Sequence, residues 1–260
     1  MVQQEDNALD RFLDITNTKN FEIGEYIPNI FILDTGCNGN DGDTMYNAIT
    51  CKIEQATDDS GHGTFIHELI HYINPMANIY HVKVLDNSSS DARTVDNAFT
   101  YLRGLQQRGI KIDLVCCSFG ADAQINNKTF MTIKKIHKEG TLFFSSIGND
   151  NKHLVYTPAN LPEFLCVGGL SSDDIEFNTR WVRSNYSRIT DIMALAENID
   201  VPNNNIKIDG TSFANAIVVG QVSKLMSKYA NVTKDDIKDR LSNIDNMMSL
   251  NTANGYLILK

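Results

Sequence analysis

Two overlapping patterns of chemically active residues lie in the segment SGHGTFIHELIHYINP, residues 60–75. Residues 67–71 read His-Glu-x-x-His, a spacing that on a helix turns two imidazoles toward one zinc ion and supplies a glutamate as base. Residues 61–64 read Gly-His-Gly-Thr, which indicates a histidine at a helix start that takes a proton from a distant serine. The two patterns predict different enzymes.

A serine mechanism needs three partners, and the chain supplies them in the order Asp34, His62 and Ser212. A serine hydroxyl is a weak nucleophile until an imidazole removes its proton, and a carboxylate must hold that imidazole in one tautomer. Asp34 ends an apolar run, His62 begins a helical pattern, and Ser212 lies in a turn before a long apolar segment. These are the positions at which an open α/β sheet binds its ligands.

Helical and extended patterns alternate along the chain. Short apolar or β-branched runs predict strands at 29–36, 78–85, 113–120 and 141–149. Apolar stripes, two of them closed by glycine, predict helices at 62–73, 94–109, 127–140 and 210–230, and Thr233 and Asp236 have capping-box spacing. The alternation predicts an α/β fold of three layers, a doubly wound, mostly parallel sheet with helices on both faces. The length predicts one domain over 1–260, with 1–27 as a helical or extended lead-in.

The composition argues against several classes of partner. The net charge is -9, and Lys and Arg do not cluster, which argues against a nucleic-acid partner. No apolar stretch approaches the ~20 residues that span a bilayer, and the first residues lack a signal-peptide pattern. Cysteines are five, an odd number, and three of them lie in apolar runs: Cys116, Cys117 and Cys166. Free thiols in a reducing compartment fit this best, so we expect a cytoplasmic protein without a membrane partner.

The motifs together resemble those of the subtilisin family of serine peptidases (subtilases), whose triad follows the same chain order. ILDTG resembles the Asp motif of that family, GHGT its His motif and GTSFA its Ser motif. The resemblance covers nearly the whole chain after about residue 27, through segments such as NIYHVKVLD, CCSFG, SSIGND, YTPANLPEFLCVGGL, DIMALAENI and NGYLILK. It implies a subtilisin-like fold and a cofactor-free serine endopeptidase acting on a peptide or protein, for example by maturing a specific one.

The resemblance also implies roles for individual residues. Asp34, His62 and Ser212 would form the triad, and Asn149 would stabilise the oxyanion together with the backbone N–H of Ser212. Substrate binding would fall to the main chain of two segments: Ser118, Phe119 and Gly120, and Ile147 and Gly148. The family's calcium loop after the histidine helix is missing from this sequence, so neither calcium nor another metal is predicted.

Two alternatives stay open. A zinc peptidase needs a third ligand, and no downstream segment resembles a zincin's third-ligand motif, so we interpret His67 and His71 as packing or surface residues. A catalytically silent, peptide-binding subtilase relative is the other alternative, because the usual proline and histidine are absent after the nucleophile, where the chain reads SFANAI (212–217). The oligomeric state is not predictable from the sequence.

Three further residues, Cys37, Asp58 and Asp59, lie near the two motifs. Cys37 directly follows Asp-Thr-Gly, and we interpret it as a loop thiol near the triad aspartate. Asp58 and Asp59 precede the histidine motif and are interpreted as solvated loop charge. The alternative for the two aspartates is a border of the second substrate pocket, with a preference for Lys or Arg there.

Overall fold

The fold is built on an eight-stranded sheet in a computed structural model that describes residues 7–39, 42–174, 176–202, 204–242 and 255–260. The strand order is β3-β2-β4-β1-β5-β6-β7-β8, and only the β2–β3 pair is antiparallel. The strands are β1 (Asn29–Asp34), β2 (Thr44–Asn47), β3 (Lys52–Gln55), β4 (Asn78–Lys83), β5 (Leu114–Cys117), β6 (Leu142–Ser146), β7 (Phe164–Leu170) and β8 (Ile192–Leu195). A separate two-stranded sheet joins β9 (Ile199–Asp200) to β10 (Lys207–Ile208).

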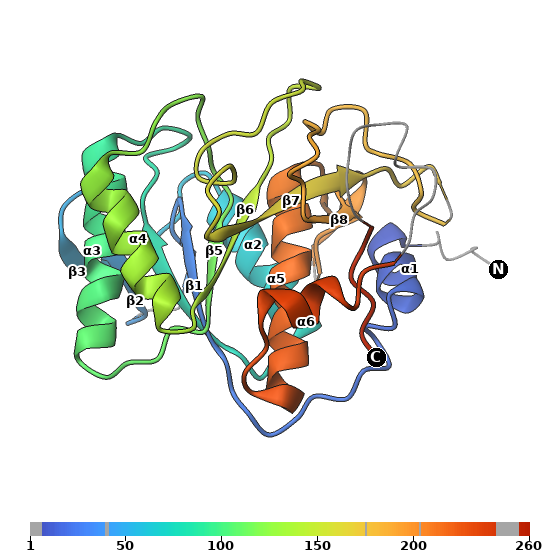
Figure 1. Ribbon diagram of the computed structural model, residues 1–260, viewed down its shortest axis with the longest axis horizontal. Helices are drawn as coiled ribbons and strands as arrows, with labels where there is room; N and C mark the ends of the chain where they lie inside the picture. The colour runs from blue at the N-terminus through green and yellow to red at the C-terminus, as the bar shows by residue number, and fades with distance from the viewer. Residues whose placement is uncertain (1–6, 40–41, 175, 203, 243–254) are drawn as a thin grey trace.

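Helices cover both faces of the sheet (Figure 1). One layer contains α2 (His62–Ile73) and α5 (Thr211–Tyr229), and the other contains α3 (Ala92–Gln107) and α4 (Asn127–Lys138). Two shorter helices, α1 (Ala8–Ile15) and α6 (Lys234–Lys238), pack at the α5 side through Leu9, Phe12 and Ile237. The predicted three-layer α/β class is confirmed.

Strand β1 lies at the centre and serves both cores, because successive side chains of a strand point to opposite faces. Ile30 and Ile32 pack into the α2–α5 core, whereas Phe31 and Leu33 pack into the α3–α4 core. Parallel partners flank the strand on both sides, β4 on one and β5 on the other. The strand order therefore reverses at β1, and ligands of open α/β sheets bind beyond the carboxyl ends of strands at such a point.

Most elements follow the predicted pattern. The helix predicted at 62–73 has those bounds, and the capping box of Thr233 and Asp236 is formed at the start of α6. All five cysteines are free, and the three in apolar runs are buried in β5 and β7. Part of the lead-in is the helix α1, against which the chain's end packs, since the Leu259 N–H donates to the Thr16 carbonyl. Residues 1–6 and Asn254 of the closing motif lie outside the described residues.

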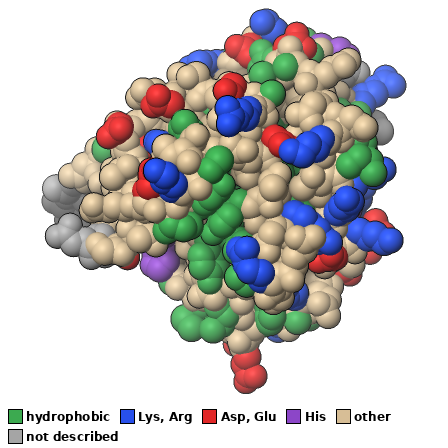
Figure 2. Space-filling view, turned by 90° about the vertical axis from the view of Figure 1, so that its left-hand side faces the viewer, with side chains coloured by type: hydrophobic (Ala, Val, Ile, Leu, Met, Phe, Trp, Pro, Cys, Tyr) green, Lys and Arg blue, Asp and Glu red, His purple; other side chains and the backbone are tan. Residues whose placement is uncertain are grey.

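On the side of α3 and α4, basic and acidic side chains are mixed on the surface (Figure 2). Figure 2 shows that lysine and arginine side chains on this face lie among acidic ones, with apolar side chains gathered near its centre.

None of the helices within the described ranges combines the length and apolar character that crossing a membrane requires.

Candidate active site

The first pair of predicted site residues is in contact. Asp34 ends β1 and is only 1% exposed, and its Oδ1 lies 2.7 Å from Nδ1 of His62, the first residue of α2. The same oxygen accepts the Thr35 N–H at 2.8 Å, which fixes the carboxylate plane. The hydrogen bond to Asp34 places the proton on Nδ1 and leaves Nε2 of His62 as the basic nitrogen.

The carboxylate of Asp58 holds the start of α2 in place. Its Oδ2 accepts from the Thr64 N–H at 2.9 Å and the Thr64 hydroxyl at 2.8 Å, and its Oδ1 accepts from the Gly61 N–H at 3.0 Å. The side chain is 4% exposed and does not line the cleft described below. The interpretation of Asp58 as solvated charge was wrong, because its carboxylate is buried and accepts N–H groups at the start of α2. The exposed Asp59 agrees with solvated loop charge, and the border of a second substrate pocket stays a prediction.

Asp34 raises the pKa of His62. Burial lowers the pKa of His62, but the negative charge of Asp34 and its hydrogen bond to the ring outweigh burial, so the pKa lies above its ordinary value of 6.5. The more distant charge of Asp58 acts in the same direction. This imidazole therefore accepts a proton more readily than a free one, which is the property that a general base needs.

Ser212 lies in the first turn of α5. The turn is entered through Gly210, whose φ of 148° strongly favours glycine. The ring of the following Phe213 lies 5.3 Å from the His62 ring, centroid to centroid. In this structure, however, Ser212 Oγ donates to the Ser118 carbonyl at 3.2 Å, and no hydrogen bond joins it to His62 within the described part of the chain. The hydroxyl is thus turned toward the residue that follows β5, while the neighbouring Phe213 contacts the His62 ring.

Asn149 is oriented by its contacts with α5. Its Oδ1 accepts both the N–H and the hydroxyl of Thr211, each at 2.9 Å. The Thr211 hydroxyl also accepts the Gly148 N–H at 3.3 Å, so its own proton is free to go to Asn149. Because Oδ1 is occupied by two donors, the Nδ2 amide group is left to donate elsewhere, and it lies at the Gly210 end of α5.

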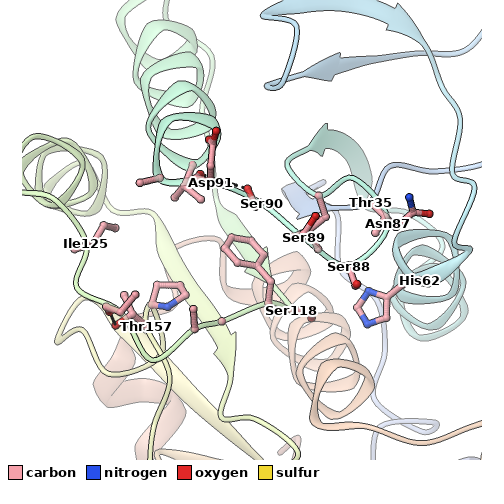
Figure 3. Close-up of a pocket in the computed structure, with 18 of the residues that line it drawn as sticks. Thr35, His62, Asn87, Ser88, Ser89, Ser90, Asp91, Ser118, Ile125 and Thr157 are labelled. Carbon is pink, nitrogen blue, oxygen red and sulfur yellow. Dashed lines mark hydrogen bonds between the residues drawn. The ribbon is translucent and has the colours of Figure 1, made fainter.

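A cleft of about 720 Å³ extends from His62 along the carboxyl ends of β4 and β5. Figure 3 shows His62 at one end, with Ser88, Ser89 and Ser90 along one wall and Ile125 and Thr157 at the far end. Predicted residues Ser118, Phe119 and Gly120 line it, and apolar contact comes from Leu85, Val95 and Ile125. A groove of this size and mixed polarity accommodates several residues of an extended peptide.

Two residues predicted to bind substrate have a different position. Ile147 is fully buried, its N–H donates to the Val167 carbonyl, and its own carbonyl accepts from Asn185 Nδ2. The Gly148 carbonyl accepts the Asn185 N–H at 2.9 Å, and a Cβ at Gly148 would lie 2.5 Å from Asn185 Nδ2. Neither residue lines the cleft. Ile147 and Gly148 instead brace the turn that carries Asn149.

Some residues around the site were missed by sequence reasoning. Residues 87–91 form one wall of the cleft, but no role is predicted for them from the sequence. Their run of small polar residues directly after a predicted strand is a signal that could have found them. Asn215, buried in the altered stretch after Ser212, donates through Nδ2 to Cys116 Sγ at 3.3 Å and Ser118 Oγ at 3.2 Å. The first turn of α5 is thereby attached to the end of β5 by side-chain hydrogen bonds.

The His-Glu-x-x-His spacing does not build a zincin-type site. His67 turns Nδ1 toward Nε2 of His81 on β4, at 2.9 Å, and His71 is exposed. The interpretation of the two motif histidines as packing and surface residues agrees with these positions.

Comparison with known proteins places the chain among relatives of one kind. The profile of the Subtilase family matches residues 29–256. The chain is 24% identical over 198 residues to the thermostable alkaline protease of Halalkalibacterium halodurans, covering 71% of this chain and 52% of that protein. It is 27% identical over 210 residues to alkaline protease 1 of Aspergillus flavus, covering 73% and 49% respectively. The chain thus spans about half the length of these two curated relatives.

Solved structures show the same fold. A cold-adapted subtilisin-like serine proteinase superposes with a TM-score of 0.77 at 20% identity over 92% of both chains, and sphericase with 0.75 at 19% over 88% of both. The family profile covers most of the sequence, including Asp34, His62, Asn149 and Ser212. The chain belongs to the subtilase family.

Proposed function

We propose that the protein is a serine endopeptidase in which Asp34, His62 and Ser212 form the triad and residues 1–260 act as one peptidase domain. The observation that carries this proposal is the 2.7 Å contact between Asp34 Oδ1 and His62 Nδ1, next to the first turn of the helix that holds Ser212. His62 takes the Ser212 proton as the hydroxyl attacks the scissile carbonyl, and returns it to the leaving amine. Asp34 orients the ring and stabilises its charged form.

Substrate binding itself supplies the step that aligns the nucleophile. Ser212 Oγ now donates to the Ser118 carbonyl, which is an acceptor at the end of β5 facing the cleft. An extended peptide that pairs with residues 118–120 brings its own N–H to this carbonyl and replaces the serine as donor. The hydroxyl is then released to turn about its Cα–Cβ bond toward Nε2 of His62.

The oxyanion is held by two donors. The Asn149 amide has its oxygen fixed by Thr211 and its Nδ2 free, and the Ser212 N–H stands at the start of α5, where no intrahelical acceptor exists for it. Donors that are fixed before the reaction stabilise the tetrahedral intermediate more than the planar substrate carbonyl. Peptides and proteins are the proposed substrates, and the free cysteines favour the cytoplasm as the location.

A fluorophosphonate probe with mass mapping tests the assignment on the full chain. The expected result is one modified residue, Ser212, and no modification in His62→Ala or Ser212→Ala. Absence of labelling together with activity that a chelator abolishes would overturn the proposal in favour of a zinc peptidase.

One observation favours a second function, a silent peptide-binding protein: the Ser212 hydroxyl faces Ser118 and not His62. The same probe decides between the two, because a silent protein would stay unlabelled even in the presence of a peptide that it binds. Peptide binding is measured in parallel with a fluorescent peptide library, so that loss of binding and loss of chemistry are separated.

A further inference from the structure

The side of α2 that faces away from the cleft carries a cluster of three potential metal ligands. Cys37, on the loop after β1, His67 of α2 and His81 of β4 each bring one ligand atom within 4.8 Å of the other two. Cys37 is 6% exposed and both histidines are half-buried. None of the three lines the cleft beside His62.

The two imidazoles face each other in a manner that suits a shared cation. His67 Nδ1 and His81 Nε2 lie 2.9 Å apart, so one of these nitrogens must carry a proton for the pair to hydrogen bond. Nδ1 of His81 is buried and has no hydrogen-bond partner among the described residues. On a tetrahedral zinc ion, two imidazole nitrogens lie about 3.3 Å apart. The two rings therefore need to move apart by only a few tenths of an ångström to admit the metal.

The charge states of the histidines suit metal binding. Burial and the charge of His71 lower the pKa of His67, and burial with the charge of His67 lowers the pKa of His81 to about 3. Both rings are therefore neutral at pH 7, which is the form that coordinates a metal. Burial, together with the negative charges of Asp58 and Glu68, raises the pKa of the Cys37 thiol to about 11, so the thiol is protonated in the metal-free protein and loses its proton only when a metal binds.

We infer that Cys37, His67 and His81 bind one zinc ion, with water in the fourth tetrahedral position. Two imidazoles and one thiolate form a nitrogen and sulfur set that favours zinc over magnesium or calcium. On binding, the Cys37 thiol releases its proton to solvent and its sulfur becomes the third protein ligand. The imidazole nitrogen that carries the shared proton loses it to solvent, and the other nitrogen of the same ring takes up a proton, so that the ring stays neutral. The ion would tie together the loop after β1, helix α2 and strand β4, which are the elements that hold Asp34 and His62. This site does not depend on the proposed peptidase activity.

Cobalt substitution on the full-length chain provides the main test. After removal of metal with a chelator, Co²⁺ should bind at a ratio of one per chain and show a thiolate-to-cobalt charge-transfer band in the near ultraviolet. Zn²⁺ should bleach this band by displacement. A cobalt spectrum without a thiolate band would overturn the inference without any variant, so a folding defect cannot obscure the result.

Matched variants then locate the ligands. Cys37→Ser should abolish the band and weaken Zn²⁺ binding by more than the about 10–100-fold that loss of an outer-shell partner costs. Cys51→Ser should change neither, because Cys51 is an exposed cysteine outside the cluster. His81→Ala should lose binding, whereas the exposed His71→Ala should keep it. Equal loss in His71→Ala would assign the metal to the His-Glu-x-x-His spacing and overturn the cluster.

Thermal unfolding gives a readout that is independent of spectroscopy. Zn²⁺ at about 100 times its Kd should raise the Tm of the full chain by about 5–10 °C, because a ligand bound only by the folded state stabilises it. Cys51→Ser should show the same increase. An unchanged Tm under saturating Zn²⁺ would contradict a site that joins three elements of the fold.

Discussion

Two of the three histidines of helix α2, His62 and His67, lie in opposite surroundings. His62, in the first turn, faces the cleft and contacts the buried carboxylate of Asp34. His67 lies five residues later, about 140° around the helix, and faces a second imidazole, that of His81. The surroundings of each ring shift its pKa in opposite directions: Asp34 raises the pKa of His62 above 6.5 against the effect of burial, whereas burial and the charge of His71 lower the pKa of His67 below 6.5. A histidine motif therefore indicates no chemistry until the partner of each ring is known.

The largest expected effect is the loss of His62. His62→Ala should lower kcat by about 10⁶, a magnitude taken from subtilisin, a member of the same family. Asp34→Asn should lower kcat by about 10⁴, because the ring is then held in the wrong tautomer. Rates are measured with a fluorogenic peptide. The matched control on the same helix is the exposed His71→Ala, whose rate should stay within about twofold. If His62→Ala kept most of the activity, the cleft-facing ring would not be the base.

Asn149→Asp removes the proposed oxyanion donor but keeps an oxygen that can accept the hydrogen bonds of Thr211. An aspartate still offers an oxygen to Thr211, but it has no N–H to give and adds a negative charge where one develops. We expect kcat to fall by at least about 10²–10³, again the magnitude known for subtilisin, with little change in KM. Circular dichroism and Tm serve as controls for folding. An unaffected kcat would show that Asn149 only braces α5.

Asp58 connects the two regions, because its charge reaches His62 on one side and Cys37 and His81 on the other. Asp58→Asn should cost about 1–3 kcal/mol of unfolding free energy, since hydrogen bonds to a buried carboxylate are weakened. Burial raises the pKa of Asp58, but the hydrogen bonds from Thr64 and Gly61 outweigh it and lower the pKa below 3.8. Its stabilisation is therefore present above pH 3.8 and is lost as the pH falls through the lowered pKa.

Urea unfolding at neutral and acid pH measures both parts of this prediction. The exposed neighbour provides the control, and Asp59→Asn should change the unfolding free energy by no more than about 0.5 kcal/mol. Equal effects of the two substitutions would mean that the hydrogen bonds of Asp58 add nothing to the start of α2.

The sequence predicted β1 with Asp34 at its end and α2 with His62 at its start, because each rests on a local signal. An apolar run ends at Asp34, and small residues mark the turns before His62 and Ser212. The hairpin of β2 and β3 was not predicted, because its short strands, TMYN and KIEQ, lack a regular alternation of apolar and polar residues. The fold class could be predicted from the alternation of whole helices and strands, because errors of two or three residues at their ends do not change that alternation.

The positions that the sequence could not locate depend on long-range pairing. Ile147 and Gly148 adjoin Asn149 in sequence, but their main-chain groups form hydrogen bonds with Val167 and Asn185. The cluster around Cys37 comes from three separate segments. His81 reaches His67 only because β4 pairs with β1 in the register that sets His81 against Ile32. No periodicity within one segment encodes such a register.

The smallest expected effect is a difference in titration between the two histidine regions of the metal-free protein. NMR of the ring protons should place the His62 midpoint above 6.5, the His67 midpoint below it and the His81 midpoint at about 3. Between 6.5 and its raised pKa, His62 binds more protons when folded, so its stabilisation is present below pH 6.5 and is lost as the pH rises through that pKa.

The opposite sign holds for His67, which binds more protons when unfolded, so stability falls as the pH drops below 6.5. Asp34→Asn removes the charge beside His62 and should lower only the His62 midpoint, whereas His71→Ala removes a neighbouring charge and should raise only the His67 midpoint. A common midpoint for both rings, unmoved by either substitution, would mean that their partners do not control their charge and that the two regions are electrostatically alike.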